Sequence, residues 1–158
     1  MNITVISVGK IKEKYFTAAI DEYSKRLSRF AKLNIIEVAD EKIPDNASEK
    51  EMEQIKEKEC NKILAKLPQN SFVVTLCIEG KEHSSEELAK KIADISMTSS
   101  HITFIIGGSL GLSDTVKSKS ALRLSFGKMT LPHQLMRVVL LEQIYRAFKI
   151  NNNESYHK

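Results

Sequence analysis

Short segments of strand-like composition alternate with longer segments of helical periodicity along the whole chain. Five runs rich in Ile, Val, Leu and Phe predict strands, at residues 2–8, 33–38, 71–78, 102–106 and 122–126. Apolar spacings of three and four, or an N-terminal capping box, predict helices over residues 14–29, 48–66 and the segment after Ser84. This order indicates an α/β domain with a mostly parallel sheet and helices on both faces. Ligands bind such sheets at the carboxyl ends of the strands, so the functional loops should follow strands.

The size and apolar content predict a single soluble domain over residues 1–158. Hydrophobic residues make up 42% of the chain and charged residues 28%, which is the balance of a globular protein with a core. The longest unbroken apolar run, Val138–Leu141, is far shorter than the roughly 20 residues that a membrane helix needs. The N-terminus lacks a secretory pattern. We therefore expect a cytoplasmic protein with no membrane partner.

The last predicted helix, residues 134–149, is apolar on almost every side. A helix without a polar stripe must be covered by more than one surface. A homodimer would provide the second cover, and burial by the helix's own domain is the alternative. Arg137 enters this helix as an unpaired cation, because Glu142 stands at i,i+4 spacing from Arg146 and not from Arg137.

Basic residues are concentrated in the C-terminal quarter. Residues 115–158 hold 8 basic and 2 acidic side chains, whereas residues 1–114 hold 16 and 18. Such asymmetry favours a polyanionic partner, for which a solvated basic face is the alternative. Cys60 and Cys77 have no zinc-like spacing and are expected to be reduced and packed. We also find no carboxylates clustered at strand ends for magnesium, and expect no metal.

Three strand ends are candidates for a ligand site: Leu76–Lys81, in which Glu79-Gly80 is expected to turn the chain, Gly107–Gly111, and Phe126–Pro132. Glycines after a strand allow the backbone to approach a ligand closely. The sequence G-G-S-L-G matches neither a dinucleotide-binding fingerprint nor a Walker A loop, so a phosphate cradle is disfavoured. From these residues alone, the glycines fit ordinary turns as well as a cofactor site.

Several separated motifs resemble one family. They are Phe104–Gly111 (FIIGGSLG), Leu124–Gln134 (LSFGKMTLPHQ), Arg137–Ala147 (RVVLLEQIYRA), the opening Ile3–Lys14 with Val8-Gly9-Lys10, and the closing Tyr156-His157-Lys158. In this order they resemble the SPOUT-class methyltransferases that methylate N3 of a pseudouridine in bacterial large-subunit ribosomal RNA. The resemblance spans essentially the complete chain. It implies a deep C-terminal trefoil knot, S-adenosylmethionine as cofactor, a homodimer, and 23S rRNA within the large subunit or the 70S ribosome as substrate.

The resemblance also implies which residues contact the cofactor. By position these are Leu76, Gly107, Phe126, Gly127, Lys128, Met129, Thr130 and Leu131. They fall on the same three strand ends. Gly127 departs from the Ser of many relatives, so only a backbone contact is expected there.

The acceptor chemistry points to four further residues. N3 of a pseudouridine is an imide nitrogen that is weakly nucleophilic while protonated, so a base or a stabilising cation would assist its methylation. His133, Arg137, Tyr156 and His157 are the candidates. The alternatives are packing for His133, a buried ion pair in a dimer for Arg137, and fraying of the last residues for Tyr156 and His157.

Two other functions remain open. A nucleotide-binding oxidoreductase would use the same sheet, but this chain lacks the dinucleotide fingerprint after its first strand. A non-catalytic ribosome-binding module would keep the basic C-terminal quarter and would not need the loop at residues 126–132.

Overall fold

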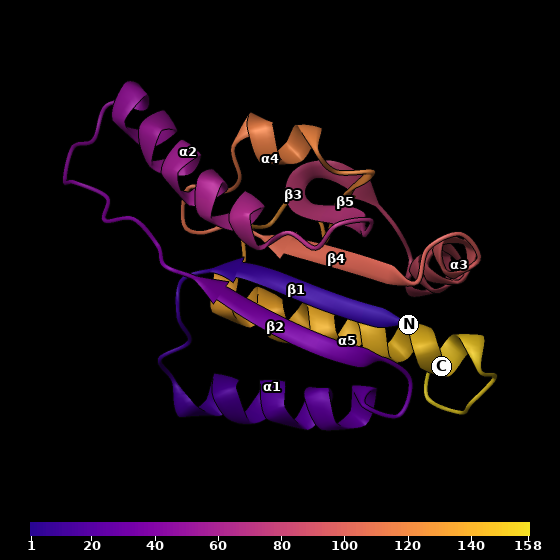
Figure 1. Ribbon diagram of the computed structural model, residues 1–158. Coiled ribbons are helices and arrows are strands. Elements are labelled where there is room, and N and C mark those ends of the chain that lie inside the picture. Colours follow the sequence, from indigo (N-terminus) through magenta and orange to yellow (C-terminus); the bar gives the residue numbers. More distant parts are fainter.

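The computed structural model describes residues 1–158 and contains one sheet of five parallel strands (Figure 1). The strands are β1 (Asn2–Val8), β2 (Lys32–Val38), β3 (Phe72–Glu82), β4 (His101–Ile106) and β5 (Leu122–Ser125). Their order across the sheet is β2-β1-β4-β3-β5. β1 pairs with β4, so that Asn2 lies opposite His101. Because every pairing is parallel, the carboxyl ends of all strands lie at one edge of the sheet.

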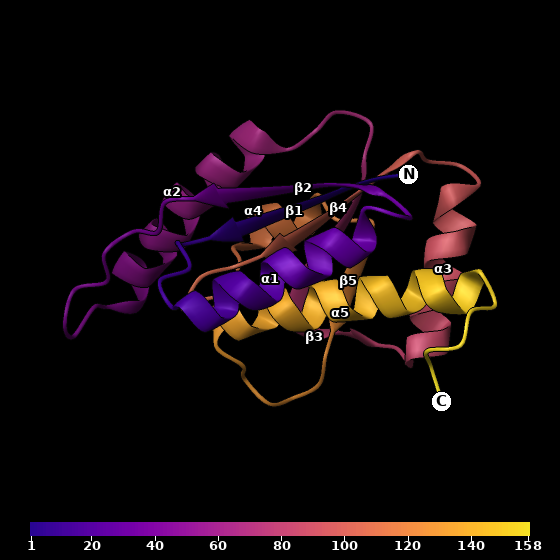
Figure 2. The same ribbon diagram turned by 90° about the horizontal axis from the view of Figure 1, so that it is seen from below.

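Five helices cover the sheet. They are α1 (Lys14–Leu27), α2 (Glu49–Lys66), α3 (Ser85–Ser96), α4 (Asp114–Ser118) and α5 (His133–Asn151). α1, α3 and α5 pack on one face, and α2 and α4 lie on the other (Figures 1 and 2). The predicted α/β architecture with helices on both faces is confirmed. The trefoil knot implied by the family resemblance stays a prediction.

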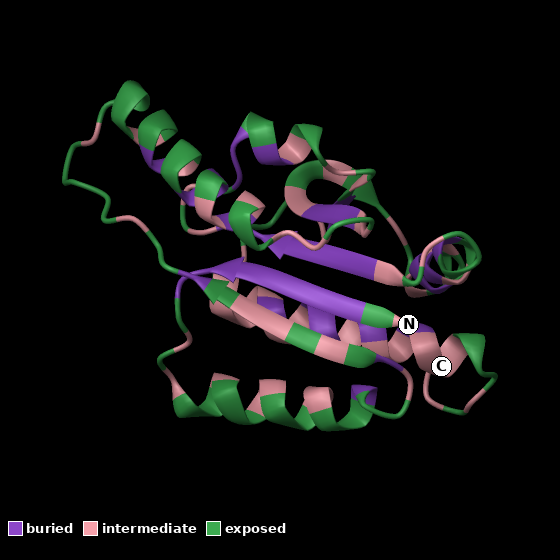
Figure 3. Cartoon of the chain, in the orientation of Figure 1, coloured by how far each residue is buried: buried purple, intermediate pink, exposed green.

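The core lies on both faces of β1 and β4, which are the most deeply buried strands (Figure 3). In β1, Ile3 and Val5 pack with α1, α3 and α5, whereas Ile6 and Val8 pack with α2 and α4. This alternation explains the continuous apolar composition of the strand, because a strand covered on both faces has no polar side. None of the helices combines the length and the apolar character needed to cross a bilayer.

β3 continues beyond the point where the sequence predicted a turn. Glu79-Gly80 lies inside the strand, in a bulge where Leu124 of β5 pairs with both Leu76 and Lys81. A Cβ atom at Gly80 would lie 2.7 Å from the carbonyl oxygen of Arg123, so glycine is needed for this close approach. The predicted turn was wrong because a bulge and a turn both favour glycine next to a polar residue.

α5 is the central helix of its layer. Leu140, Leu141, Ile144 and Ala147 are fully buried, and α5 packs against α1, α3 and the sheet. From His133 to Ile150 no side chain is exposed. The helix's own domain therefore covers most of its apolar surface, as the alternative interpretation held.

Arg137 is not the unpaired cation that the sequence predicted. Its side chain is 2% exposed, and Nη1 lies 2.5 Å from Oε2 of Glu37 in β2. Nη2 donates to the carbonyl oxygens of Val8 at 3.2 Å and Gly9 at 2.6 Å. Both partners belong to the same chain, with Arg137 buried and Glu37 38% exposed, so the pairing needs no dimer partner. Helical spacing could not reveal it, because its partner lies 100 residues away.

Candidate active site

A cleft of about 780 Å³ opens at the carboxyl edge of the sheet. Its walls come from residues 76–79 in the bulged part of β3, from the loops that follow β4 and β5, and from the first turn of α5. Seven of the eight residues that the resemblance assigned to the cofactor line it, namely Leu76, Gly107, Phe126, Gly127, Met129, Thr130 and Leu131. Lys128 is exposed next to them. Three segments that are distant in the sequence thus form one cavity.

The loop after β4 is folded tightly on itself. Gly108 and Gly111 form an isolated antiparallel bridge, and Gly111 has a φ of +80°. A Cβ atom at Gly107 would lie 2.7 Å from the carbonyl carbon of Gly111. Any side chain at Gly107 would therefore displace the loop itself. Glycine is required here by the backbone as well as by the cleft.

Behind this loop stands Glu59 of α2, which the sequence did not single out. Its side chain is 5% exposed and accepts a hydrogen bond from the backbone N–H of Glu41 at 3.0 Å. Both carboxyl oxygens would lie 3.5 Å from a Cβ atom at Gly108. Burial raises the pKa of the Glu59 carboxyl, with the charge of Asp40 acting in the same direction.

The loop after β5 is held by one buried hydroxyl group. Ser125 Oγ donates to the carbonyl oxygen of Ile78 at 2.8 Å and accepts from the backbone N–H of Gly127 at 3.1 Å. Gly127 has a φ of +118°, and a Cβ atom there would have no neighbour within 4 Å. The positive φ, and not lack of space, is what favours glycine at this position. Met129 extends outward and is 87% exposed.

The lining of the cleft fits S-adenosylmethionine. Half of its 22 lining residues are hydrophobic, and the others bring glycine-rich backbone, Ser and Thr to the same space. Pockets for small ligands typically have about 300 to 1,000 Å³ and a mainly apolar wall with a few polar groups. No three His, Cys, Asp or Glu side chains are grouped closely enough to hold a metal ion.

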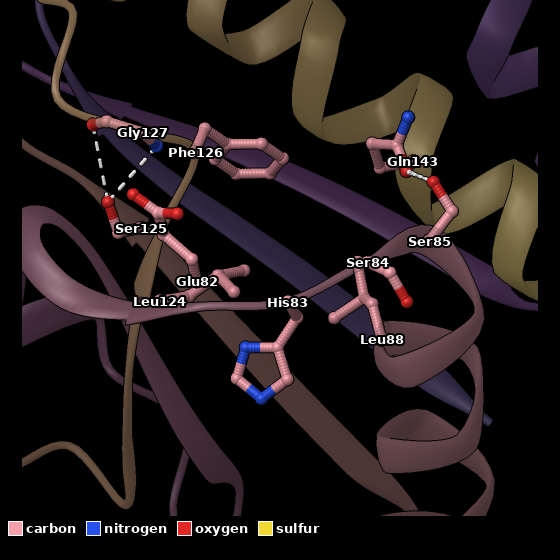
Figure 4. Close-up of a pocket in the computed structure, with 10 residues that line it drawn as sticks. All are labelled: Glu82, His83, Ser84, Ser85, Leu88, Leu124, Ser125, Phe126, Gly127 and Gln143. Carbon is pink, nitrogen blue, oxygen red and sulfur yellow. Dashed lines mark hydrogen bonds between the residues drawn. The ribbon is translucent and has the colours of Figure 1, made fainter.

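A smaller hollow of about 260 Å³ adjoins the cleft (Figure 4). The two cavities share Leu124, Phe126 and Gly127, so that the loop after β5 forms the wall between them. The far wall is polar, because Ser85 Oγ donates to Oε1 of Gln143 at 2.7 Å. The hollow therefore leads from the cofactor loop toward the middle of α5.

His133 lies at the wall of the main cleft, in the first turn of α5. It is half-buried, and a Cβ atom at Gly9 would lie 3.3 Å from its Nε2 atom. Burial lowers the pKa of the imidazole, the positive charge of Arg137 lowers it further, and Asp40 opposes both. His133 is consequently neutral near pH 7 and can accept a proton.

Tyr156 and His157 do not fray from the end of the chain. The Tyr156 hydroxyl donates to Oε1 of Glu142 at 3.0 Å, and the Arg146 guanidinium lies 4.6 Å from the centre of the Tyr156 ring. His157 contacts Glu86 at 2.8 Å through Nε2 and Arg146 at 3.1 Å through Nδ1. The tail thus docks on the second half of α5. Arg146 is 13 residues beyond His133, or about 20 Å along the helix.

Comparison with known proteins agrees with this geometry. The family model described as predicted SPOUT methyltransferase matches residues 1–157. The chain belongs to the SPOUT methyltransferase family. Proteins of this family use S-adenosylmethionine as methyl donor, and this chain therefore takes the same cofactor. The family resemblance seen in the motifs is confirmed.

Full-length relatives give a more specific picture. The chain is 60% identical to ribosomal RNA large subunit methyltransferase H of Clostridioides difficile and 62% identical to that of Clostridium novyi, each over 100% of both chains. A solved structure described as a probable methylase family protein of Haemophilus influenzae superimposes with a TM-score of 0.55 at 14% identity. That match covers 99% of this chain and 70% of the other, and it supports the fold.

Proposed function

We propose that this protein transfers the methyl group of S-adenosylmethionine to N3 of a pseudouridine in 23S rRNA, within the large subunit or the 70S ribosome. The observation that carries the proposal is the cleft at the carboxyl edge of the sheet, since part of β3 and the loops after β4 and β5 line one cavity of suitable size. The names of the full-length relatives support large-subunit ribosomal RNA as the substrate.

When bound, S-adenosylmethionine supplies a methyl group that is already activated, so the protein must align the acceptor and remove its proton. Leu76, Gly107 and the loop 126–131 would hold the cofactor. Neutral His133 stands at the wall of the same cleft and is the best candidate to accept the N3 proton. Arg137 cannot contact the acceptor in this arrangement, because its guanidinium is buried against Glu37.

Only half of the cations in the basic C-terminal quarter are free to bind the phosphates of an RNA. Four of its eight cations, Lys117, Arg137, Arg146 and Lys149, form ion pairs within the chain. The other four, Lys119, Arg123, Lys128 and Lys158, are exposed. Lys128 extends from the cofactor loop itself, where it would neutralise a phosphate close to the acceptor.

We infer that the active form is a homodimer in which the tail of one subunit completes the cleft of the other. Within one chain, Tyr156 and His157 dock on Glu142 and Arg146, about 14 and 20 Å along α5 from His133. A two-fold axis near α5 would bring one tail over the partner's cleft. Along the outer side of the helix, Leu135, Val138 and Val139 remain only half-buried, and they would supply apolar contact area.

Methyl transfer from labelled S-adenosylmethionine into purified ribosomes that lack this modification tests the function. We expect label at N3 of one pseudouridine, located by mass mapping of rRNA fragments. His133→Ala should bind the cofactor normally and lose about 100-fold in rate, whereas Lys50→Ala on the outer side of α2 should match the wild type. Cofactor binding without transfer to any ribosomal particle would refute the substrate, and absence of cofactor binding would favour the non-catalytic module.

Complementation tests the shared site. His133→Ala and Tyr156→Ala should each be inactive alone, and mixed dimers should recover about a quarter of the wild-type activity if one cleft in each heterodimer carries both native residues. Sedimentation equilibrium measures the mass independently. A monomer at working concentration, or mixed dimers without activity, would contradict the arrangement.

A further inference from the structure

We propose that Arg137 and Glu37 are positioning residues, which lock the turn after β1 against the start of α5 and thereby hold the His133 imidazole at the wall of the cofactor cleft. This inference rests on the proposed function for its catalytic consequence. Its structural basis is the set of contacts between residues 8–12, Glu37 and the first turns of α5, called here the β1 clamp.

The β1 clamp is centred on the Arg137 guanidinium. Nη1 binds Oε2 of Glu37 at 2.5 Å, and Nη2 donates to the carbonyl oxygens of Val8 and Gly9 at 3.2 and 2.6 Å. These carbonyl groups belong to the end of β1 and the residue after it, where the chain leaves the sheet. One side chain of α5 therefore joins two strands and a turn.

Glu37 fastens the same turn from the other side. Its Oε2 atom also accepts a hydrogen bond from the backbone N–H of Ile11 at 3.1 Å. The backbone N–H of Lys12 donates to Oε1 of Gln134 at 3.3 Å, and that of Gly9 donates to the carbonyl oxygen of Val38 at 2.8 Å. The turn is thus bound by β2 and by α5 at four backbone positions.

The imidazole of His133 lies next to this turn at Gly9. Gly9 has a φ of +90°, which carries the backbone past the imidazole, and a Cβ atom there would approach Nε2 to 3.3 Å. His133 and Arg137 are four residues apart in α5 and therefore lie on the same side of the helix. The guanidinium binds the carbonyl groups at the end of β1, and the imidazole faces the cleft. Displacing Gly9 would free the imidazole to rotate.

Stability alone does not account for an arginine at this position. The Nε atom of Arg137 is buried without a hydrogen-bond partner. Burying a charge has a large desolvation cost, and the guanidinium of Arg137 is 2% exposed while its partner Glu37 is 38% exposed. The buried arginine is therefore explained by a role in positioning His133 and not by stability.

The clamp also fixes the charge around His133. The groups that face the imidazole are Arg137 on its own helix and Asp40 from the segment after β2, with Glu37 on the far side of Arg137. Lys10 and Lys12 in the turn are exposed. Loss of the arginine charge should therefore raise the pKa of His133 in a folded variant.

Titration of the histidine resonances by NMR, in the full-length protein without RNA, tests the clamp separately from catalysis. In Arg137→Gln we expect the pKa of His133 to rise by about 0.5 or more, while Arg137→Lys keeps it close to the wild-type value. Arg26→Gln removes a surface arginine that pairs with Glu22 and is the matched control. A folded Arg137→Gln with an unchanged His133 titration would overturn the proposal.

Single-turnover methylation of ribosomes across pH gives the catalytic readout. In Arg137→Gln, the pH at which the rate falls on the acid side should rise by the same amount as the His133 pKa. The cofactor affinity should be unchanged within about threefold. Glu37 is 38% exposed, so Glu37→Ala should fold even if Arg137→Gln does not. It should lower the rate about tenfold without changing the cofactor Kd. A wild-type rate in Glu37→Ala would refute the clamp, whereas no transfer by the wild type would refute only the proposed function.

Discussion

The docked tail predicts that Tyr156 ionises only at unusually high pH. Desolvation raises the pKa of Tyr156 from 10.0 to about 12, and the hydrogen bond to the Glu142 carboxylate and its negative charge act in the same direction. The perturbation is Glu142→Gln, which keeps the size of the side chain and removes the charge. We expect the pKa of Tyr156 to fall in this variant but to stay above 10.0, because the desolvation of the ring persists.

The sign of the effect on tail docking follows from the raised pKa. A group whose pKa is higher in the folded state stabilises that state fully below its unfolded pKa of 10.0, and this contribution is lost as the pH rises through about 12. The difference is equivalent to about 2.7 kcal/mol. Solvent screening at a half-exposed tail reduces it to about 1 kcal/mol, so the docking equilibrium should weaken about fivefold.

Absorbance of the tyrosinate ion is a clean assay, because the chain has four Tyr and no Trp. The wild type should show one late step near pH 12, and Tyr156→Phe should remove it. Glu154→Gln lies in the same tail but pairs with Arg29 and Lys149, so it is the control and should leave the late step in place. A wild type without a late step, or a late step that stays at the same pH in Glu142→Gln, would refute the reasoning.

Three more predictions concern the cleft and the residue behind it. Burial raises the pKa of Glu59, so the contribution of this carboxyl to stability is lost as the pH rises above 4.5 through that pKa. Glu59→Gln should therefore raise the Tm at pH 7, and an unchanged or lower Tm in a thermal scan would contradict this. Gly127→Ala should weaken S-adenosylmethionine binding about tenfold by calorimetry, since a φ of +118° costs alanine about 1 to 3 kcal/mol, and equal affinity would exclude the loop from the site. Burial also raises the pKa of the Cys77 thiol in the cleft, so maleimide should label Cys77 slowly at pH 7 and more slowly with cofactor bound. Buried Cys60 should stay unlabelled. Intact-mass measurements that show faster labelling with cofactor bound would contradict the prediction.

Local pattern was enough to predict the sheet, most helices and the three segments that line the cleft. β-strand composition, helical spacing and the capping boxes at Ser48 and Ser84 are properties of neighbouring residues, and both boxes are present in the structure. α4 was missed because five residues are too few to show a helical period. The loops could be found because ligand sites of parallel sheets follow strands.

Contacts between distant segments could not be read in the same way. Arg137 looked unpaired since its partner Glu37 belongs to another strand, and the tail looked frayed since its anchor on Glu142 depends on how the chain turns after α5. Glu59 drew no attention, because a glutamate in a highly charged helix normally faces water. Each case requires the fold before the partner can be identified.

The pairing of Asn2 with His101 has a consequence for how the protein is made. During synthesis β1 can align with β2 early, but its other edge stays unpaired until about two thirds of the chain has left the ribosome. Contacts of such wide sequence separation form slowly, and unpaired edges favour aggregation meanwhile. The cleft is completed later still, when residues 126–136 arrive. The methyl donor can therefore stabilise only a nearly finished chain and cannot assist the earlier steps of folding.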